Sequence, residues 1–207
     1  MFRLSDFEIR IAKTEHLAIL YKESLEKRGD VPVNVDYVRD CESLMVYRGN
    51  RLIGGCILNN GSIHDLRYFE VYKNPKDKDL LLKTEGIKES DIMEMSCIFS
   101  YAKSDFERIA FYTLIFYKTR QFLQLWNKKI IIGGSIHTPI QMIQMRLMRH
   151  VILRSTVNET LKMEGHENSV VMIYYCKSSE FVGNALYTIY SFIRDGFTKK
   201  RRVPTVS

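Results

Sequence analysis

The sequence predicts an α/β (α+β) protein: a mixed central sheet with helices on both faces and a splayed pair of parallel strands. Apolar, strand-like runs at Ile92–Phe99 and Ile130–Ile132 flank a long helical pattern, which is typical of two parallel strands joined by a crossover helix. Gly133 and Gly134 interrupt the second run, so we expect the two strands to part there and leave a cleft. A hairpin earlier in the chain and a closing strand near its end complete the predicted sheet.

Composition predicts one domain over residues 1–197, followed by a basic, flexible tail over residues 198–207. Hydrophobic residues make up 45% of the chain and charged residues 27%, ordinary values for a soluble globular protein and unlike those of a disordered one. The N-terminal residues lack the continuous apolar segment of a secretory signal. The most apolar windows are shorter than the roughly 20 residues of a membrane-spanning helix. We therefore expect a cytoplasmic protein with no transmembrane segment.

The first elements follow from local patterns. Phe7–Ala12 alternates apolar and charged residues, as a half-buried strand does. Thr14 can cap the helix that follows, and Gly29 can end it. Asp30–Cys41 contains polar breaks and is expected to be a loop with a short helical piece.

A β-hairpin is the strongest local signal. Ser43–Arg48 and Arg51–Asn59 are apolar runs joined at Gly49-Asn50, two residues that suit a turn with positive φ. A weaker strand is predicted near Leu66–Tyr72.

Two helices dominate the middle of the chain. The helix predicted over residues 105–126 has Asp105 as its N-cap and an unusually wide apolar surface, so it must be covered on most sides. Thr138 and Pro139 can start a further helix that carries Val151 inward.

The C-terminal part supplies a closing strand at Val170–Cys176 and a helix over Glu180–Asp195 that stops at Gly196. The predicted order is β-α-β-β-β-β-α-β-α-β-α.

Four scattered cysteines are expected to be reduced thiols, because no C-x-x-C pair is present: Cys41, Cys56, Cys97 and Cys176. The five histidines show no metal-ligand spacing, so no metal site is predicted. A nucleophilic role for Cys97 is an open alternative to the ordinary role of a small hydrophobic residue.

The net charge is +7, and cations cluster locally. Lys128 and Lys129 follow the long helix, and Arg146 and Arg149 lie near the end of the next one. An acidic partner, such as a phosphate-bearing cofactor or an acidic carrier protein, fits this pattern, and a simple solvated surface is the alternative.

The order of elements resembles the GNAT-like acyltransferase fold over about residues 7–176. The resemblance rests on Gly54-Gly55 in the second hairpin strand, on Glu94-Met95-Ser96 and on the splayed strand pair. It is nearest to the branch of N-acyl-homoserine-lactone synthases and long-chain N-acyl amino acid synthases. That branch has an Asp shortly before its hairpin, matched by Asp40, and a Glu-x-Ser-Arg signature, matched by Glu94 and Ser96 but with Cys97 in the place of Arg.

A second departure concerns the donor. Acetyl-CoA enzymes of this fold have a glycine-containing loop that cradles the pyrophosphate at a helix N-terminus, and the corresponding stretch here, Lys103–Ala110, has no glycine. The resemblance therefore implies the phosphopantetheine of an acyl carrier protein, or acyl-CoA, as cosubstrate.

Amide formation from a thioester needs a base, an oxyanion donor and an acyl slot. Glu94 is the candidate base, since an acid in an apolar strand needs a reason to be there; a solvent-facing position is the alternative. Ser96 shares its strand face, and Asp40 can bind the acceptor's amine or serve as an ordinary turn residue. His137 can aid proton transfer beside the cleft. The predicted acyl or pantetheine cleft comprises these residues, some of which can instead be plain core: Phe99, Phe111, Tyr112, Ile115, Gly133, Gly134, His137, Met142 and Met145.

The favoured function is an N-acyltransferase that moves a medium or long acyl chain from acyl carrier protein or acyl-CoA to the amine of a small acceptor such as an amino acid. Three alternatives stay open: a conventional acetyl-CoA N-acetyltransferase, a catalytically inactive module of the same fold that binds a ligand or partner, and a nucleic-acid-binding protein. The last has no helix-turn-helix, RNP or zinc motif in its favour.

Overall fold

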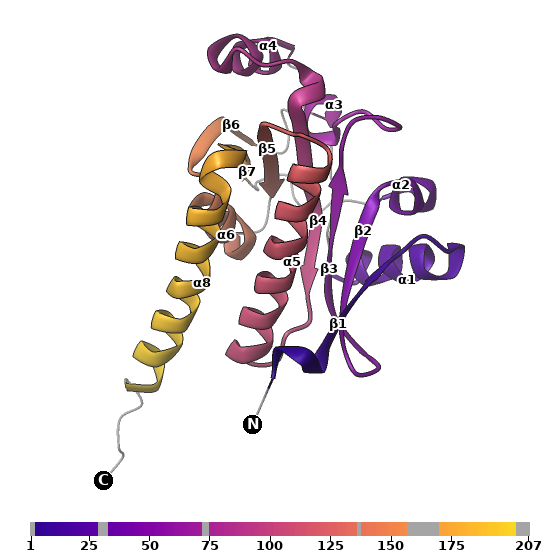
Figure 1. The fold of residues 1–207 in the computed structure, drawn as a ribbon, viewed down its shortest axis with the longest axis vertical. Helices are drawn as coiled ribbons and strands as arrows, with labels where there is room; N and C mark the ends of the chain where they lie inside the picture. The colour runs from indigo at the N-terminus through magenta and orange to yellow at the C-terminus, as the bar shows by residue number, and fades with distance from the viewer. Residues whose placement is uncertain (1–2, 29–32, 72–74, 136–137, 157–169, 202–207) are drawn as a thin grey trace.

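The computed structural model describes residues 3–28, 33–71, 75–135, 138–156 and 170–201, which form one twisted sheet with helices on both faces (Figure 1). The strand order is β1-β2-β3-β4-β5-β7-β6, and β4 and β5 are the parallel neighbours in an otherwise antiparallel sheet. The predicted fold class is confirmed. The strands are β1 Phe7–Ile11, β2 Glu42–Arg48, β3 Arg51–Asn59, β4 Ile92–Ser100, β5 Ile130–Ser135, β6 His150–Thr156 and β7 Val170–Lys177.

The helices divide between the two faces of the sheet. α1 and α2 cover one face, and α5, α6 and α8 cover the other, whereas α3 and α4 lie near the start of β4 (Figure 1). The helices are α1 Glu15–Glu26, α2 Val35–Asp40, α3 Arg67–Val71, α4 Pro75–Glu85, α5 Asp105–Leu125, α6 Thr138–Met148 and α8 Ser178–Arg201, with short 3-10 turns at Leu4–Asp6 and Glu89–Asp91.

Local sequence signals account for several boundaries. The Thr14 side chain accepts a hydrogen bond from the Leu17 amide and caps α1, as predicted. The hairpin between β2 and β3 turns at Gly49, whose φ is +57°. The cap of α5 is Ser104, whose side chain accepts from the Glu107 amide, so the prediction of Asp105 as N-cap was wrong by one residue.

Other predicted elements differ from the structure. Residues 67–71 of the predicted strand Leu66–Tyr72 form helix α3. Strand β6 was not predicted, and Val151 belongs to it rather than to the preceding helix, because Arg149 adopts a left-handed φ of 57° and breaks the helical path. Helix α8 continues through Gly196 to Arg201, so the predicted tail begins as helix, and residues 202–207 lie outside the described part.

The sheet is closely covered at Gly54 and Gly55 in β3. A Cβ atom on Gly54 would come within 2.8 Å of the Phe111 ring of α5, and one on Gly55 within 2.5 Å of the Tyr21 ring of α1. Glycine is required here because aromatic rings press on the sheet from both faces. The sheet separates a hydrophobic layer under α5 from another under α1 and α2, and a smaller third cluster surrounds Leu66 and Leu81.

None of the helices in the described residues is long and apolar enough to cross a bilayer.

Candidate functional site

The parallel strands β4 and β5 part halfway along their length. They pair from Ile92 opposite Ile130 to Met95 opposite Gly133. Beyond that point β4 pairs with β3 as far as Ser100, whereas Gly134 and Ser135 of β5 pair with β7. The predicted splay is therefore confirmed, and it begins one residue after Glu94.

A β-bulge in β4 marks the same position. Between the pairs Gly55–Phe99 and Ile57–Ser96, the β4 strand holds one residue more than β3 does. Cys97 lies in this bulge with a φ of +52°, a left-handed conformation that is uncommon outside glycine. The bulge changes the alternation of side chains, so Ser96 and Cys97 do not follow the pattern of a flat strand.

Glu94 is fully buried, which excludes the alternative of a solvent-facing strand residue. Its Oε1 accepts a hydrogen bond of 3.0 Å from the Tyr37 hydroxyl, and its Oε2 accepts one of 2.9 Å from the Tyr68 amide. Burial raises the pKa of the Glu94 carboxyl, against the opposing effects of the Tyr68 amide and the nearby Arg67 charge. A carboxylate with a raised pKa is a stronger base than an exposed one.

Tyr37 connects Glu94 to the rest of the cluster. It lies in α2, which begins where the Asn34 side chain accepts from the Asp36 amide. Its hydroxyl donates to Glu94 and also lies 3.5 Å from Ser96 Oγ. Burial, and then the Glu94 charge, raise the pKa of Tyr37, so the phenol keeps its proton at any pH of interest.

A cation reaches the bulge from a helix rather than from the strand. Arg67 of α3 donates from Nη1 to Cys97 Sγ at 2.8 Å, and its guanidinium lies 5.3 Å from the centre of the Tyr37 ring. Although burial disfavours its charge, the pKa of Arg67 is raised by the acidic and polar groups around it, first Cys97 and then Tyr37 and Glu94. The Glu-x-Ser-Arg signature has an arginine where this chain has Cys97. Here the guanidinium of Arg67 lies beside Cys97 instead.

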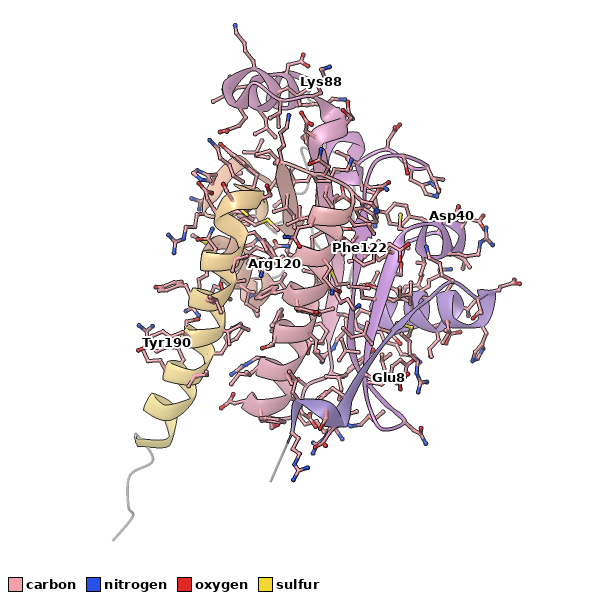
Figure 2. All side chains as sticks on the ribbon, in the orientation of Figure 1. Glu8, Asp40, Lys88, Arg120, Phe122 and Tyr190 are labelled. Atoms are coloured by element: carbon pink, nitrogen blue, oxygen red, sulfur yellow. The ribbon has the colours of Figure 1, made fainter. Side chains whose placement is uncertain are left out.

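Asp40 joins the cluster through His64. His64 Nε2 lies 3.1 Å from Asp40 Oδ2, and the His64 ring packs edge-on against Tyr37 with centroids 5.3 Å apart. The hydrogen bond to His64, followed by the charge of Arg39, lowers the pKa of Asp40, which stays ionised. Figure 2 labels Asp40 at the edge of the molecule near α2, so this end of the cluster faces outward. The three predicted catalytic residues Glu94, Ser96 and Asp40 are therefore brought to one side of the sheet.

Tyr68 bridges the two splayed strands. Its amide donates to Glu94 on β4, and its hydroxyl donates to the Gly134 carbonyl on β5 at 2.6 Å. A Cβ on Gly134 would lie 2.6 Å from the Tyr68 ring, and one on Gly133 would lie 2.6 Å from Met148 of α6. The two glycines thus admit close packing from both faces at the splay.

The remaining predicted cleft residues do not come together. Phe99 belongs to the layer under α1, whereas Phe111, Tyr112 and Ile115 are core residues under α5 on the opposite face. Met142 and Met145 are exposed on α6, and His137 lies outside the described residues. The prediction of one slot lined by all six apolar side chains was wrong, because the sheet itself separates Phe99 from the α5 residues.

The four predicted docking cations are also divided. Lys128 Nζ donates to the carbonyls of Asn60 and Ser90, and Lys129 pairs with Asp91, both at the start of β5. Arg146 of α6 and Arg149, which follows that helix, instead contact α8. Arg146 bonds to Ser191 and Asp195, and the Arg149 guanidinium lies over the Tyr187 ring. They do not form one patch.

The N-terminus of α5, where the resemblance would place a pyrophosphate, is occupied by a carboxylate of the chain itself. Glu107 is 3% exposed and accepts from the Lys103 amide. It also pairs with Arg48 at 2.8 Å and with Arg51. These interactions lower the pKa of Glu107 against the effect of burial, and they use the cations and amide that a phosphate would need.

All four cysteines described are free, as predicted. Within the described ranges, no three His, Cys, Asp or Glu side chains gather as metal ligands.

Sequence reasoning missed Tyr37, Arg67, Tyr68 and His64 as members of the site. Each comes from a loop or short helix outside the central strands. Only the position of Tyr37 three residues before Asp40, within a piece already predicted to be partly helical, offered a local signal.

The sheet order, the splayed parallel pair and the bulge on β4 define the GNAT-like acyltransferase fold, and the chain has this fold. No family model and no curated protein matches the sequence. The similarity is therefore seen in solved structures.

FeeM, an N-acyl amino acid synthase from uncultured soil microbes, superposes with a TM-score of 0.62 at 12% identity, over 89% of this chain and 96% of its own. The C-terminal condensation domain of Ebony in complex with beta-alanyl-dopamine matches with a TM-score of 0.51 at 15% identity, over 86% and 100%. The AHL synthase LasI matches with a TM-score of 0.50 at 11% identity, over 87% and 94%. At these identities the likeness establishes the fold.

Proposed function

We propose that this protein is an N-acyltransferase that moves a medium or long acyl chain from acyl carrier protein or acyl-CoA to the amine of a small acceptor such as an amino acid. The observation that carries the proposal is the fully buried Glu94, held by Tyr37 and Tyr68 one residue before the strands part. The solved structures of this fold, described as an N-acyl amino acid synthase, an AHL synthase and a domain bound to an amide of dopamine, support amide formation as the reaction class.

The reaction begins when the acceptor's free amine attacks the thioester carbonyl carbon. The carbon–sulfur bond breaks, the amide forms and the carrier leaves as a thiolate, which becomes the thiol when Glu94 gives up the proton that it took from the amine. One proton must leave the amine nitrogen, and Glu94 is the group that receives it. Its raised pKa suits this task, because the carboxylate then holds the proton more strongly than an exposed Glu would.

The proton reaches Glu94 through Tyr37. Glu94 has no exposed surface, so an acceptor amine does not touch it directly. The Tyr37 hydroxyl lies between Glu94 and Ser96, and it can pass one proton to Glu94 while it takes another from the substrate side.

Arg67 provides positive charge for the oxygen that becomes negative in the tetrahedral intermediate. Its guanidinium lies at the bulge, against Cys97, on the Glu94 side of the sheet. A fixed, partly buried cation is worth more than one in water, since the surrounding medium screens it less.

The Asp40–His64 pair is the proposed contact for the acceptor. Asp40 stays ionised and both side chains are partly exposed, so the Asp40 carboxylate can accept a hydrogen bond from the incoming amine. The His64 ring packs edge-on against Tyr37, which places this contact next to the proton path.

The arrangement around Glu107 favours a carrier-bound or pantetheine-recognised donor over recognition of a pyrophosphate. A conventional acetyl-CoA enzyme would use the N-terminus of α5 for the pyrophosphate, and here the Glu107 carboxylate takes that place and pairs with Arg48 and Arg51.

The test is turnover of medium- and long-chain acyl carrier protein thioesters, acyl-CoA thioesters and acetyl-CoA with a pool of amino acids, with products detected by mass spectrometry. We expect N-acylated product from the medium or long chains, and its loss in Glu94→Gln. Glu85→Gln is the control, because Glu85 bonds to Tyr175 and Lys177 of β7 and to no member of the Glu94 cluster.

The catalytically inactive binding module is the second candidate. It is favoured by one observation: both oxygens of Glu94 already accept hydrogen bonds from the protein itself. Binding of an acyl thioester without any product, equal in wild type and Glu94→Gln, would support this module and contradict the acyltransferase.

A further inference from the structure

Exposed apolar side chains concentrate on one side of the molecule, away from the Glu94 site. Of the fourteen large hydrophobic residues that are exposed in the described ranges, seven belong to α6, β6 and α8. We call these seven the α6–α8 apolar face: Met142, Met145, Val151, Leu186, Tyr187, Tyr190 and Ile193. Monomeric soluble proteins rarely leave such a group open without an interaction to make.

Helix α8 carries most of this face. Its inner side packs on α5 and α6 through Phe181 and Phe192, whose rings contact Phe116 and Tyr112. Its outer side presents Leu186, Tyr187, Tyr190 and Ile193, which recur at helical spacing along one stripe. Figure 1 shows α8 as a long helix at the outer side of the molecule, and Figure 2 labels Tyr190 on it.

Arg149 joins the two helices into one surface. Its guanidinium lies 5.3 Å from the centre of the Tyr187 ring, and Arg146 of α6 contacts Ser191 and Asp195 of α8, so the two helices lie side by side.

The net positive charge of the chain lies in the same two segments. Residues 138–154 and 186–202 contain eight Lys and Arg residues and a single acid, Asp195, which pairs with Arg146 and Arg194. Their net charge of +7 equals that of the whole protein, so the remainder is neutral. Exposed apolar and aromatic side chains combined with local positive charge are the chemistry of an interfacial helix on an anionic membrane.

We infer that the α6–α8 apolar face docks on an anionic lipid surface, with α8 lying along it. Exposed Leu, Ile and Tyr side chains of a helix can enter a fluid interface, and the positive charge of these two segments is complementary to the negative charge of an anionic lipid surface. The basic residues at the C-terminal end of α8 add attraction to the lipid phosphates. This inference does not depend on the proposed catalytic activity.

The test is co-sedimentation of the full chain with vesicles of pure phosphatidylcholine and with vesicles of equimolar phosphatidylcholine and phosphatidylglycerol. We expect binding to the anionic vesicles that weakens as salt is raised, and much weaker binding to the neutral ones. Leu186→Glu should lower the partition coefficient about tenfold or more, since it removes an apolar contact and adds like charge to the surface.

Leu80→Glu is the matched control. Leu80 lies in α4 and is 64% exposed, close to the 67% of Leu186, so the two variants make the same chemical change on different surfaces. Leu80→Glu should bind as wild type does. The double variant Arg149→Gln/Arg194→Gln gives a second route, and it should lower binding to anionic vesicles alone.

Three results would overturn the inference. The first is no binding to anionic vesicles, and the second is equal binding of Leu186→Glu and Leu80→Glu. The third is that the face binds a protein instead of lipid. In that case wild type would not bind vesicles but would form a dimer in light scattering, or a complex with purified acyl carrier protein, and Leu186→Glu would abolish it.

Discussion

Two buried glutamates, Glu94 and Glu107, show how partners decide the role of an acid. Both side chains are almost completely hidden from solvent, and both accept a hydrogen bond from a backbone amide. Glu107 has two arginines as direct partners, and its pKa falls. Glu94 has a phenol instead, and its pKa rises.

The different partners give the two glutamates different roles. At Glu107 the paired charges stabilise the junction between the β2–β3 hairpin and α5. At Glu94 no cation in the described part of the chain pairs directly with the buried carboxylate, so burial raises its pKa and favours uptake of a proton. A catalytic base needs this property, and a structural ion pair lacks it.

The largest expected effect is on activity, at Glu94. Glu94→Gln keeps the shape of the side chain and removes the base, so acyl transfer should fall about 10²- to 10⁴-fold. The free energy of unfolding at neutral pH should not fall with it, because the buried charge is removed as well. Steady-state kinetics and urea unfolding measure the two quantities; unchanged turnover would end the assignment of Glu94 as base.

The next effect is on stability, at Glu107. Glu107→Gln removes the negative charge that pairs with Arg48 and Arg51 and should lower the free energy of unfolding by about 2 kcal/mol, less than for a fully buried pair because both arginines are partly exposed. Turnover of the folded protein should stay near that of wild type.

Asp105→Asn is the control for this variant. Asp105 lies in the same first turn of α5 and pairs with Arg108 at the surface, so its loss should change stability by less than about 1 kcal/mol. A large effect on turnover in Glu107→Gln, with the protein folded, would mean that the two glutamates are not functionally separate.

A smaller effect is expected at Tyr37. Tyr37→Phe removes the hydroxyl between Glu94 and Ser96 and should lower turnover about tenfold, since a proton relay is lost while Glu94 remains. The Glu94 carboxyl also loses a donor, so its pKa should rise further and the acidic limb of the rate profile should move to higher pH.

Tyr47→Phe provides the comparison for the Tyr37 variant. Its buried hydroxyl contacts the Met45 sulfur and not the site, so neither the turnover nor the pH profile should change. A profile that stays in place in Tyr37→Phe would argue against the contact with Glu94.

The contrast between the two glutamates also shows how far the sequence can be taken. An acid within the apolar run Ile92–Phe99 was visible in the sequence, and so were the hairpin at Gly49 and the splay at Gly133. Each of these features depends only on residues that are close together in the sequence.

The partners that give Glu94 its character are not local. Tyr37 lies 57 residues away and Arg67 lies 30 residues from Cys97, and only tertiary packing brings them together. Residues 67–71 also read as strand, because Tyr68, Phe69 and Val71 favour strands intrinsically, and their packing against β4 overrides that preference. Strand β6 was missed since the apolar spacing of α6 continues past Arg149, where the backbone turns.

The smallest expected effect is a pair of opposite slopes in stability against pH. Because the folded-state pKa of Glu94 is raised, its contribution becomes unfavourable as pH rises from the unfolded value, about 4.3, through the higher folded value. Because the folded-state pKa of Glu107 is lowered, its stabilisation is complete above the unfolded-state pKa and is lost as pH falls through the lower folded-state pKa.

Urea unfolding of wild type, Glu94→Gln and Glu107→Gln from acid to neutral pH isolates the contribution of each glutamate. The free energy of wild type minus that of Glu94→Gln should decrease with pH, and that of wild type minus Glu107→Gln should increase. Two slopes of the same sign would mean that the two pKa values shift in the same direction, and that burial rather than the direct partners sets both of them.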